Sequence, residues 1–341
     1  MQVAAGWTGF IDVEKYKFWE ICYFMSSANV LFLAIMLIGP LVTVSSSEWI
    51  ICWVGLELRF IGFVPLLFYG NRYFSVRKEA AMKYFAIQAL GRAILLLGGY
   101  IVFGVYTETG YFSSHLFSFL AFCSLILKLG AFPCHFWVLR VAGGLRSLPL
   151  FLFITWQKVA PFALIINLLE NKFWLSFLAV LLGGLGSLVG ALIGLNQTNL
   201  RTMLGASSIS HTGWGLLACV YGSFWMYFGL YCLSFGLLLL FIIIGNNRIR
   251  GLTVARLRGL PPFLLFVGKW KVVVSAIVAR CPFGYLVLLL LGAFLRLFFY
   301  LKFLYSFYLA DRIQSYRGMW VYILAFGVFN IAGSFYLVFC C

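Results

Sequence analysis

Ionisable side chains deep inside apolar stretches are the residues of this sequence whose types and positions could do chemistry. There are five of them: Glu57, Lys128, Lys158, His211 and Lys269. A charge at the centre of a bilayer costs about 2.5–3.5 kcal/mol on insertion scales, so an ionisable residue inside a membrane span is a functional hypothesis by default. We therefore take these five residues as candidates for ion or proton transfer.

Proton exchange is the chemistry that this set favours. Glu57 is the only acid well inside an apolar stretch, and one carboxylate cannot neutralise three lysines. A buried lysine can instead release its proton, because desolvation disfavours the charged form, and a group that accepts and releases protons can serve as a relay. His211 adds another proton carrier, with Ser207 and Ser208 one turn away on a similar face. The alternative for each residue is a static ion pair or a side chain that snorkels to the membrane surface.

Composition assigns the chain to the membrane proteins. Of its 341 residues 64% are hydrophobic and 10% are charged, with a mean hydropathy of +1.02. A soluble domain of this size has too little interior for so much apolar side chain, whereas a membrane span requires about 20 apolar residues. We predict an all-α polytopic membrane protein with one membrane domain over 1–341. The eleven expected helices are 21–44, 49–70, 83–105, 112–131, 148–168, 173–195, 203–221, 224–245, 260–279, 283–307 and 319–339.

Helix-breaking residues accompany two of the buried lysines. Those that follow Lys128 are Gly130, Pro133 and His135, and those that precede Lys269 are Pro261 and Pro262. Unwound backbone within a membrane is tolerated only where it is buried in protein or lines a watery cavity. We therefore expect both lysines to lie beside broken helices to which water has access.

The two expected breaks fall five helices apart, in the fourth and ninth helices. Interrupted helices at corresponding positions of two halves indicate the ion path of inverted-repeat transporters. The sequence therefore predicts two inverted five-helix repeats, over about 21–168 and 173–307, followed by a terminal helix over about 319–339.

The net charge of +16 is unevenly divided between the two sides of the membrane. If the eleven helices alternate, the side opposite the N-terminus receives only Lys172 and Arg280. The N-terminal side receives Lys15, Lys17, Arg72, Arg77, Lys78, Lys83, Arg140, Arg146, Arg201, Arg248, Arg250, Arg256, Arg258, Arg312 and Arg317. This asymmetry follows the positive-inside rule and places the N-terminus on the cytoplasm-like side.

Nucleic-acid binding requires basic residues gathered on one exposed face. The basic residues here are instead spread over the connections on one side of the membrane, so we expect no nucleic-acid partner.

Cofactor motifs are lacking, and one helix has a small-residue motif. The nine cysteines are scattered without a CxxC pair, so we expect no iron–sulfur or zinc site, and no Gly-rich loop follows a strand. Gly186, Gly190 and Gly194 recur every four residues, a spacing that lets a neighbouring helix approach closely.

Six motifs, in order along residues 49–271, carry a family resemblance. They are WVGLELRFIGFVPLL, EAAMKYFAIQALG, LKLGAFPCHFW, TWQKVAP, LNQTNLRTMLGASSISHTGW and GLPPFLLFVGKW. Together they resemble the subunit 2 family of mitochondrial NADH–ubiquinone oxidoreductase, respiratory complex I. The resemblance implies the antiporter-like fold and a place in the mitochondrial inner membrane, with the N-terminus in the matrix and the C-terminus in the intermembrane space.

The resemblance also implies a role for each candidate residue. Glu57 matches the glutamate that tunes the first lysine, Lys128, and Lys158 matches the lysine that links the half-channel to the central axis. His211 matches a histidine of that axis, and Lys269 the terminal lysine. The chain is expected to take part in proton translocation, while NADH, FMN, iron–sulfur clusters and ubiquinone are bound by other subunits. Expected partners are subunits 3, 4L and 4 and membrane lipids.

Several residues depart from the family pattern. Arg59 and Arg92 stand where relatives carry small or neutral residues, Arg140 replaces a glutamate, and Leu264–Leu265 replaces Thr-Gly after the double proline. A guanidinium cannot lose its proton in a protein. Glu57 is two positions from Arg59, about 200° away around a helix, and no other acid is deep in a span. We expect each arginine to require carbonyls, water, a lipid phosphate or an acid of another subunit, and at least one to contact a neighbouring subunit or a lipid phosphate.

Two other classes of function stay open at this point. A free-standing cation/proton antiporter needs the same spans and lysines, and ion exchange by the purified monomer distinguishes it. A purely structural scaffold predicts that the buried lysines can be replaced without loss of pumping.

Overall fold

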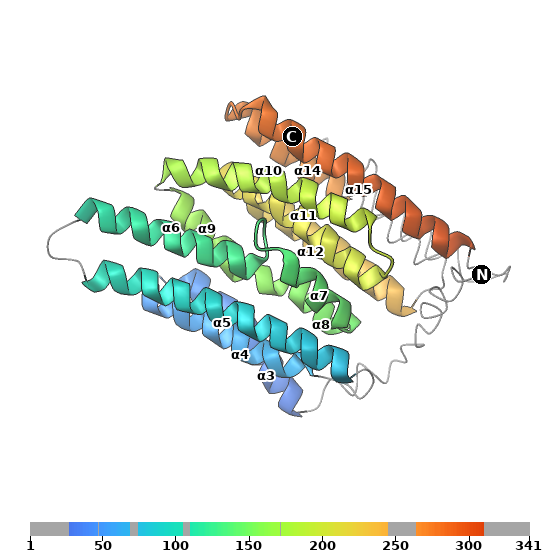
Figure 1. Ribbon diagram of the computed structural model, residues 1–341, viewed down its shortest axis with the longest axis horizontal. Coiled ribbons are helices and arrows are strands. Elements are labelled where there is room, and N and C mark those ends of the chain that lie inside the picture. Colours follow the sequence, from blue (N-terminus) through green and yellow to red (C-terminus); the bar gives the residue numbers. More distant parts are fainter. Residues whose placement is uncertain are drawn as a thin grey trace.

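The computed structural model describes residues 27–46, 48–68, 74–104, 110–170, 172–244 and 264–309, and this part of the chain contains helices and connecting turns without a strand. Figure 1 shows the helices side by side. Their bounds are α3 Ser27–Ser45, α4 Trp49–Leu67, α5 Phe74–Gly104, α6 Gly110–Leu129, α7 Phe136–Gly144, α8 Ser147–Ile154, α9 Trp156–Glu170, α10 Phe173–Leu195, α11 Leu200–Val220, α12 Phe224–Ile244, α14 Leu264–Val278 and α15 Phe283–Leu309.

Six of the described helical segments are long and apolar enough to cross a membrane. They are α3, α4, α5, the segment Ser147–Glu170, α10 and α15, and His115–Leu129 and Phe224–Leu239 form shorter apolar helices. The chain is thus an all-helical, multi-pass membrane protein, as its composition predicted. The eleventh expected helix, 319–339, lies outside the described residues, and the inverted repeat stays a prediction.

Three features of the helices differ from the sequence-based expectation by more than a few residues. The segment expected as one helix over 148–168 is divided into α8 and α9 at Thr155, whose backbone N–H and hydroxyl both donate to Phe151 O, at 2.9 and 2.7 Å. The short helix α7 was not expected. Helix α5 begins at Phe74 rather than near residue 83, so Arg77 and Lys83 lie in its first turns and not in a connection.

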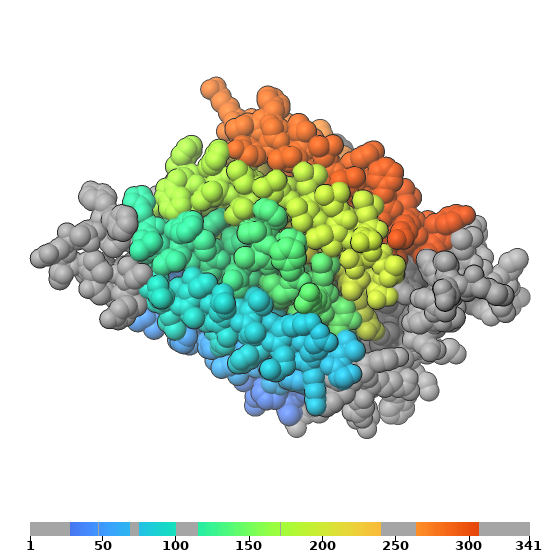
Figure 2. Space-filling view, viewed as in Figure 1, coloured from blue at the N-terminus to red at the C-terminus, as the bar shows by residue number. Residues whose placement is uncertain are grey.

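Some helices that are adjacent in sequence pack together, such as α3 with α4 and α10 with α11, while α10 also packs against α15 and α3 against α9. Helices α3–α5 lie along one flank, α14 and α15 along the other, and α6–α12 between them (Figure 1). The space-filling view shows the same succession of segments (Figure 2). Among the described residues, the central helices lie between α4 and α14 (Figure 1).

Glycines set the separation of α10 from its neighbours, as their spacing predicted. A Cβ added at Gly190 lies 2.6 Å from Ser210 N of α11, and one added at Gly194 lies 2.7 Å from Phe299 Cε1 of α15. Gly186 is less constrained, since its added Cβ meets Phe132 Cβ at an ordinary 3.5 Å. Two of the three glycines therefore permit close approach.

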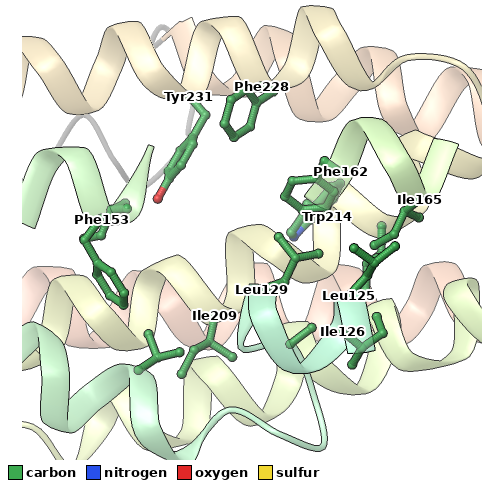
Figure 3. Packing of buried hydrophobic residues seen from close by; sticks show 14 of the residues in the cluster. Leu125, Ile126, Leu129, Phe153, Phe162, Ile165, Ile209, Trp214, Phe228 and Tyr231 are labelled. Carbon is green, nitrogen blue, oxygen red and sulfur yellow. The ribbon is translucent and has the colours of Figure 1, made fainter. Parts of the chain in front are cut away.

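Aromatic side chains fill the centre of the bundle. Tyr231 and Phe228 of α12 face a region that Phe153 of α8, Phe162 of α9 and Trp214 of α11 also border (Figure 3). All five side chains belong to the buried core. The central helices that position the candidate residues are thus held by packing of large apolar groups.

Candidate functional site

Glu57 and Arg92 form an ion pair between α4 and α5. The Arg92 guanidinium carbon also lies 4.1 Å from the centre of the Phe60 ring, a cation–π contact. The expectation that Arg92 finds no acid in its own chain is wrong. The spacing of residues within one helix does not reveal this pair, because it forms across two packed helices.

Lys128 is buried in the last turn of α6, close to this pair. Gln88 Nε2 donates to Lys128 O at 3.3 Å, and a Cβ added at Gly91 lies 3.0 Å from Lys128 Cγ. Among the described residues, no hydrogen bond or ion pair joins Lys128 Nζ to another group, and Glu57 pairs with Arg92 instead. We call Glu57, Arg59, Arg92 and Lys128 the first polar cluster.

The chain leaves the α-helical path directly after Lys128. Helix α6 ends at Leu129, and Gly130 has a φ of +65°, a conformation that favours glycine. A Cβ at Gly130 lies 2.2 Å from Val138 Cγ2, so space as well as conformation requires glycine there. Pro133 follows in the turn before α7, and His135 Nδ1 lies 3.0 Å from Pro133 O. Water access at this turn stays a prediction.

Prolines inside two helices leave backbone carbonyls without their helical N–H donor, and buried side chains donate hydrogen bonds to these carbonyls instead. Pro161 has no N–H for the carbonyl four residues earlier, that of Gln157. Arg59, which is buried, donates Nη1–H to this carbonyl oxygen. Each of the two unexpected arginines therefore has a partner within the chain, and an outside partner stays a prediction.

The same arrangement links α9 to α3. Pro40 leaves Met36 O without its helical donor, and Trp156 Nε1 donates to that oxygen at 3.2 Å. The Tyr84 hydroxyl donates to Gln157 Oε1 at 3.1 Å. The residues directly before Lys158 are thus bonded to α3, α4 and α5.

Lys158 extends from this anchored position toward the second half of the chain. Its Nζ donates to Ser208 O of α11 at 3.1 Å, and the side chain is buried. Ser207 directs its own hydroxyl to Leu204 O at 2.8 Å, within its helix. Ser208 Oγ is buried without a hydrogen-bond partner in the part that the structure describes. The backbone of Ser208, rather than its hydroxyl, contacts the lysine.

His211 lies one turn further along α11, among tyrosines. Its Nδ1 is 2.7 Å from the Tyr227 hydroxyl oxygen, and its ring centre is 4.5 Å from that of Tyr231. Lys269 of α14 is buried, with Nζ 5.8 Å from the centre of the Trp214 ring. Lys269 lies within electrostatic range of His211.

Arg296 of α15 belongs to the same group, although the sequence argument did not single it out. Its side chain is 0% exposed, and Nε, Nη1 and Nη2 have no hydrogen-bond partner among the described residues. It lies within electrostatic range of His211 and Lys269. The rule that identified the buried lysines would also have identified Arg296, because it stands in the apolar stretch 283–307. We call His211, Tyr227, Tyr231, Lys269 and Arg296 the second polar cluster.

All five candidate residues therefore fall on one succession of packed helices, from Glu57 on α4 to Lys269 on α14, with Lys158 between the two clusters. The expected helix break at Pro261 and Pro262 lies outside the described residues. Within the described ranges, no group of three His, Cys, Asp or Glu side chains could hold a metal ion.

Comparison with known proteins identifies the family. The model of the family "NADH:quinone oxidoreductase/Mrp antiporter, TM" matches residues 46–253, more than half of the chain. NADH-ubiquinone oxidoreductase chain 2 of Albinaria caerulea is 34% identical over 285 residues, covering 84% of this chain and 91% of the relative. That of Anopheles gambiae is 34% identical, covering 83% and 87%. This chain belongs to the NADH-ubiquinone oxidoreductase chain 2 family.

Solved structures share the fold of this chain. A chain of respiratory complex I from Thermus thermophilus with bound aureothin aligns with a TM-score of 0.75 at 23% identity, covering 94% of this chain and 80% of that one. A chain of the Mrp complex from Dietzia aligns with a TM-score of 0.71 at 17% identity, covering 80% and 59%. The antiporter-like fold that the motifs implied is confirmed.

Proposed function

We propose that this chain translocates protons as the antiporter-like subunit 2 of the membrane arm of NADH–ubiquinone oxidoreductase, in the mitochondrial inner membrane. Family membership supports the assignment to that enzyme. One structural observation carries the mechanism: Lys158 is buried between the two polar clusters and reaches Ser208 of α11 from α9. A proton carrier at this position can pass charge from one half of the bundle to the other.

The proposed role of each candidate residue follows from its position in the bundle. Lys128, beside the turn that ends α6, accepts a proton, and Glu57 tunes its affinity through the opposite charge. Lys158 transfers the proton across the middle of the bundle. His211 receives it, and Lys269 releases it at the far flank. Each step moves one proton between a neutral base and its protonated form, so no redox chemistry occurs in this chain.

Neighbouring parts of the enzyme complete the activity. NADH, FMN, iron–sulfur clusters and ubiquinone are assigned to other subunits, and subunits 3, 4L and 4 together with membrane lipids are the proposed contacts. The two inverted five-helix repeats, the N-terminus in the matrix and the C-terminus in the intermembrane space are parts of the same proposal. The positive-inside charge asymmetry supports the orientation.

The test is proton transport by the assembled complex in lipid vesicles. We expect Lys128→Ala to lower the number of protons moved per NADH oxidised while the amount of assembled complex stays unchanged. Lys302→Gln is a matched control, because Lys302 is an exposed lysine near the end of α15. Equal proton yields for Lys128→Ala and the control would refute the relay and favour a structural role for the lysine.

A further inference from the structure

The Arg92 guanidinium is held by three groups at once. It pairs with Glu57 Oε1, and its carbon atom lies 4.1 Å from the Phe60 ring centre and 5.9 Å from that of Phe85. The side chains of Arg92 and Glu57 are only 17% and 22% exposed. Because arginine stays charged and is held in place by aromatic rings, it fixes the position of the carboxylate with which it pairs.

The same face of α5 holds Lys128. Gln88, Gly91 and Arg92 are spaced at i, i+3 and i+4, so they share one side of the helix. Gln88 Nε2 donates to Lys128 O at 3.3 Å, and a Cβ added at Gly91 lies 3.3 Å from Lys128 Cε. The Lys128 amine is bonded to that Cε, so it lies next to the residue that precedes Arg92.

Two polar groups in this region lack partners among the described residues. Glu57 Oε2 is buried and accepts no hydrogen bond from them, although Oε1 is paired. The Lys128 amine donates none within the described residues. A buried carboxylate oxygen without a donor is costly. Arg59, the other cation of the cluster, is engaged with Gln157 O, so Lys128 is the nearby cation that remains for this oxygen.

We propose that Arg92 is a positioning residue for the proton relay. By binding Oε1 it holds Glu57 so that Oε2 is the acceptor for the Lys128 ammonium group whenever that lysine carries a proton. When Lys128 passes its proton on, its neutral amine leaves Oε2, and the Arg92–Glu57 pair keeps the carboxylate in place for the next proton. This inference rests on the proposed function, and it adds that Arg92 acts through Glu57.

A double-mutant cycle on the assembled complex in lipid vesicles tests this inference. The variants are Arg92→Gln, Glu57→Gln and both together, and the readout is the proton-transport rate at a fixed rate of NADH oxidation. We expect each single variant to lose roughly tenfold, or about 1.4 kcal/mol. The double variant should be no slower than Glu57→Gln alone, since Arg92 then has no carboxylate to hold. Losses that multiply in the double variant, or no loss in Arg92→Gln, overturn the proposal.

Two further variants separate this result from misfolding and from failure of the relay. Lys83→Gln removes the exposed Lys83–Glu79 pair on the same helix and should leave transport unchanged. Arg92→Lys keeps a cation but loses the planar contact with Phe60, so we expect a smaller loss that disappears in the Glu57→Gln background. A loss that persists there overturns the proposal even if Arg92→Gln does not assemble. Normal transport in Glu57→Gln would instead refute the role of Glu57 in the proposed function.

Discussion

The first and second polar clusters contain the same kinds of cations but hold them differently. In the first cluster, Arg92 has a carboxylate and Arg59 has a carbonyl that Pro161 leaves free. In the second cluster, the described residues include no acid, and Arg296 is buried without a hydrogen bond. Specific bonds thus fix both arginines of the first cluster, whereas in the second cluster His211 contacts the Tyr227 hydroxyl and Arg296 has no hydrogen-bond partner among the described residues. Substitutions should therefore affect the two clusters differently.

The largest expected effect is at Lys158, where the two clusters meet. Lys158→Met keeps most of the length of the side chain but removes the proton carrier, so we expect proton transport per NADH to fall by at least about a hundredfold, the low end of what a positioned proton-transfer group contributes. The measurement is proton uptake by vesicles that contain the complex.

Ser208→Ala is the matched control for that substitution. Lys158 donates to the backbone oxygen of Ser208, and the Ser208 hydroxyl has no partner in the described structure. Removing only the hydroxyl should leave transport within experimental error of the unmodified complex. A loss in Ser208→Ala as large as that in Lys158→Met contradicts the bridging role.

Glycine substitutions distinguish backbone packing near the second cluster from side-chain packing in the first. A Cβ at Gly190 meets Ser210 N at 2.6 Å, so Gly190→Ala must separate α10 from α11 and should destabilise the chain by about 1–3 kcal/mol. At Gly91 the nearest atom is Lys128 Cγ, at 3.0 Å, in a flexible side chain that can shift. Gly91→Ala should therefore cost less, and Gly229→Ala, with nothing within 4 Å of its added Cβ, should cost least. Thermal denaturation of the purified complex ranks the three variants.

Replacing each buried arginine by methionine compares the clusters directly. Arg59→Met leaves Gln157 O without a donor, whereas Arg296→Met leaves no acceptor unpaired in the described structure. An orphaned buried group costs about 1–3 kcal/mol, and apolar replacement of a buried charge is often neutral or stabilising. We expect Arg296→Met to be the more stable variant in chemical denaturation. The reverse order would mean that Arg296 has a partner outside the described residues.

The smallest expected difference lies within the second cluster. The Tyr227 hydroxyl is 2.7 Å from His211 Nδ1, whereas Tyr231 OH is buried without a partner in the described residues. Tyr227→Phe should therefore cost about 1 kcal/mol, and Tyr231→Phe should be within about 0.5 kcal/mol of the unmodified chain. If Tyr227→Phe and Tyr231→Phe lower the thermal stability of the complex by the same amount, the 2.7 Å contact adds nothing beyond a hydroxyl without a partner.

Local features of the fold were predictable because they depend on short stretches of sequence. Apolar length identified the membrane-crossing segments, and the four-residue glycine spacing predicted close approach to α10 at Gly190 and Gly194. The free carbonyls of Met36 and Gln157 were also implicit, since each stands four residues before a proline within a helix. Arg296 could have been recognised by the same rule as Lys158. The division at Thr155 could not, because the stretch 147–170 is long and apolar enough for one continuous span.

By itself, the sequence determined that this is a helical membrane protein of its family and which buried side chains could carry protons. Only the tertiary structure decided their partners: Arg92 on Glu57, Arg59 on Gln157 O, Trp156 on Met36 O and Lys158 on Ser208 O. The physical reason is the separation in sequence between the residues that interact. The helical period relates residues three or four positions apart. A contact between helices depends on how far each whole helix is rotated and shifted against its neighbour, and that is the outcome of packing along its entire length.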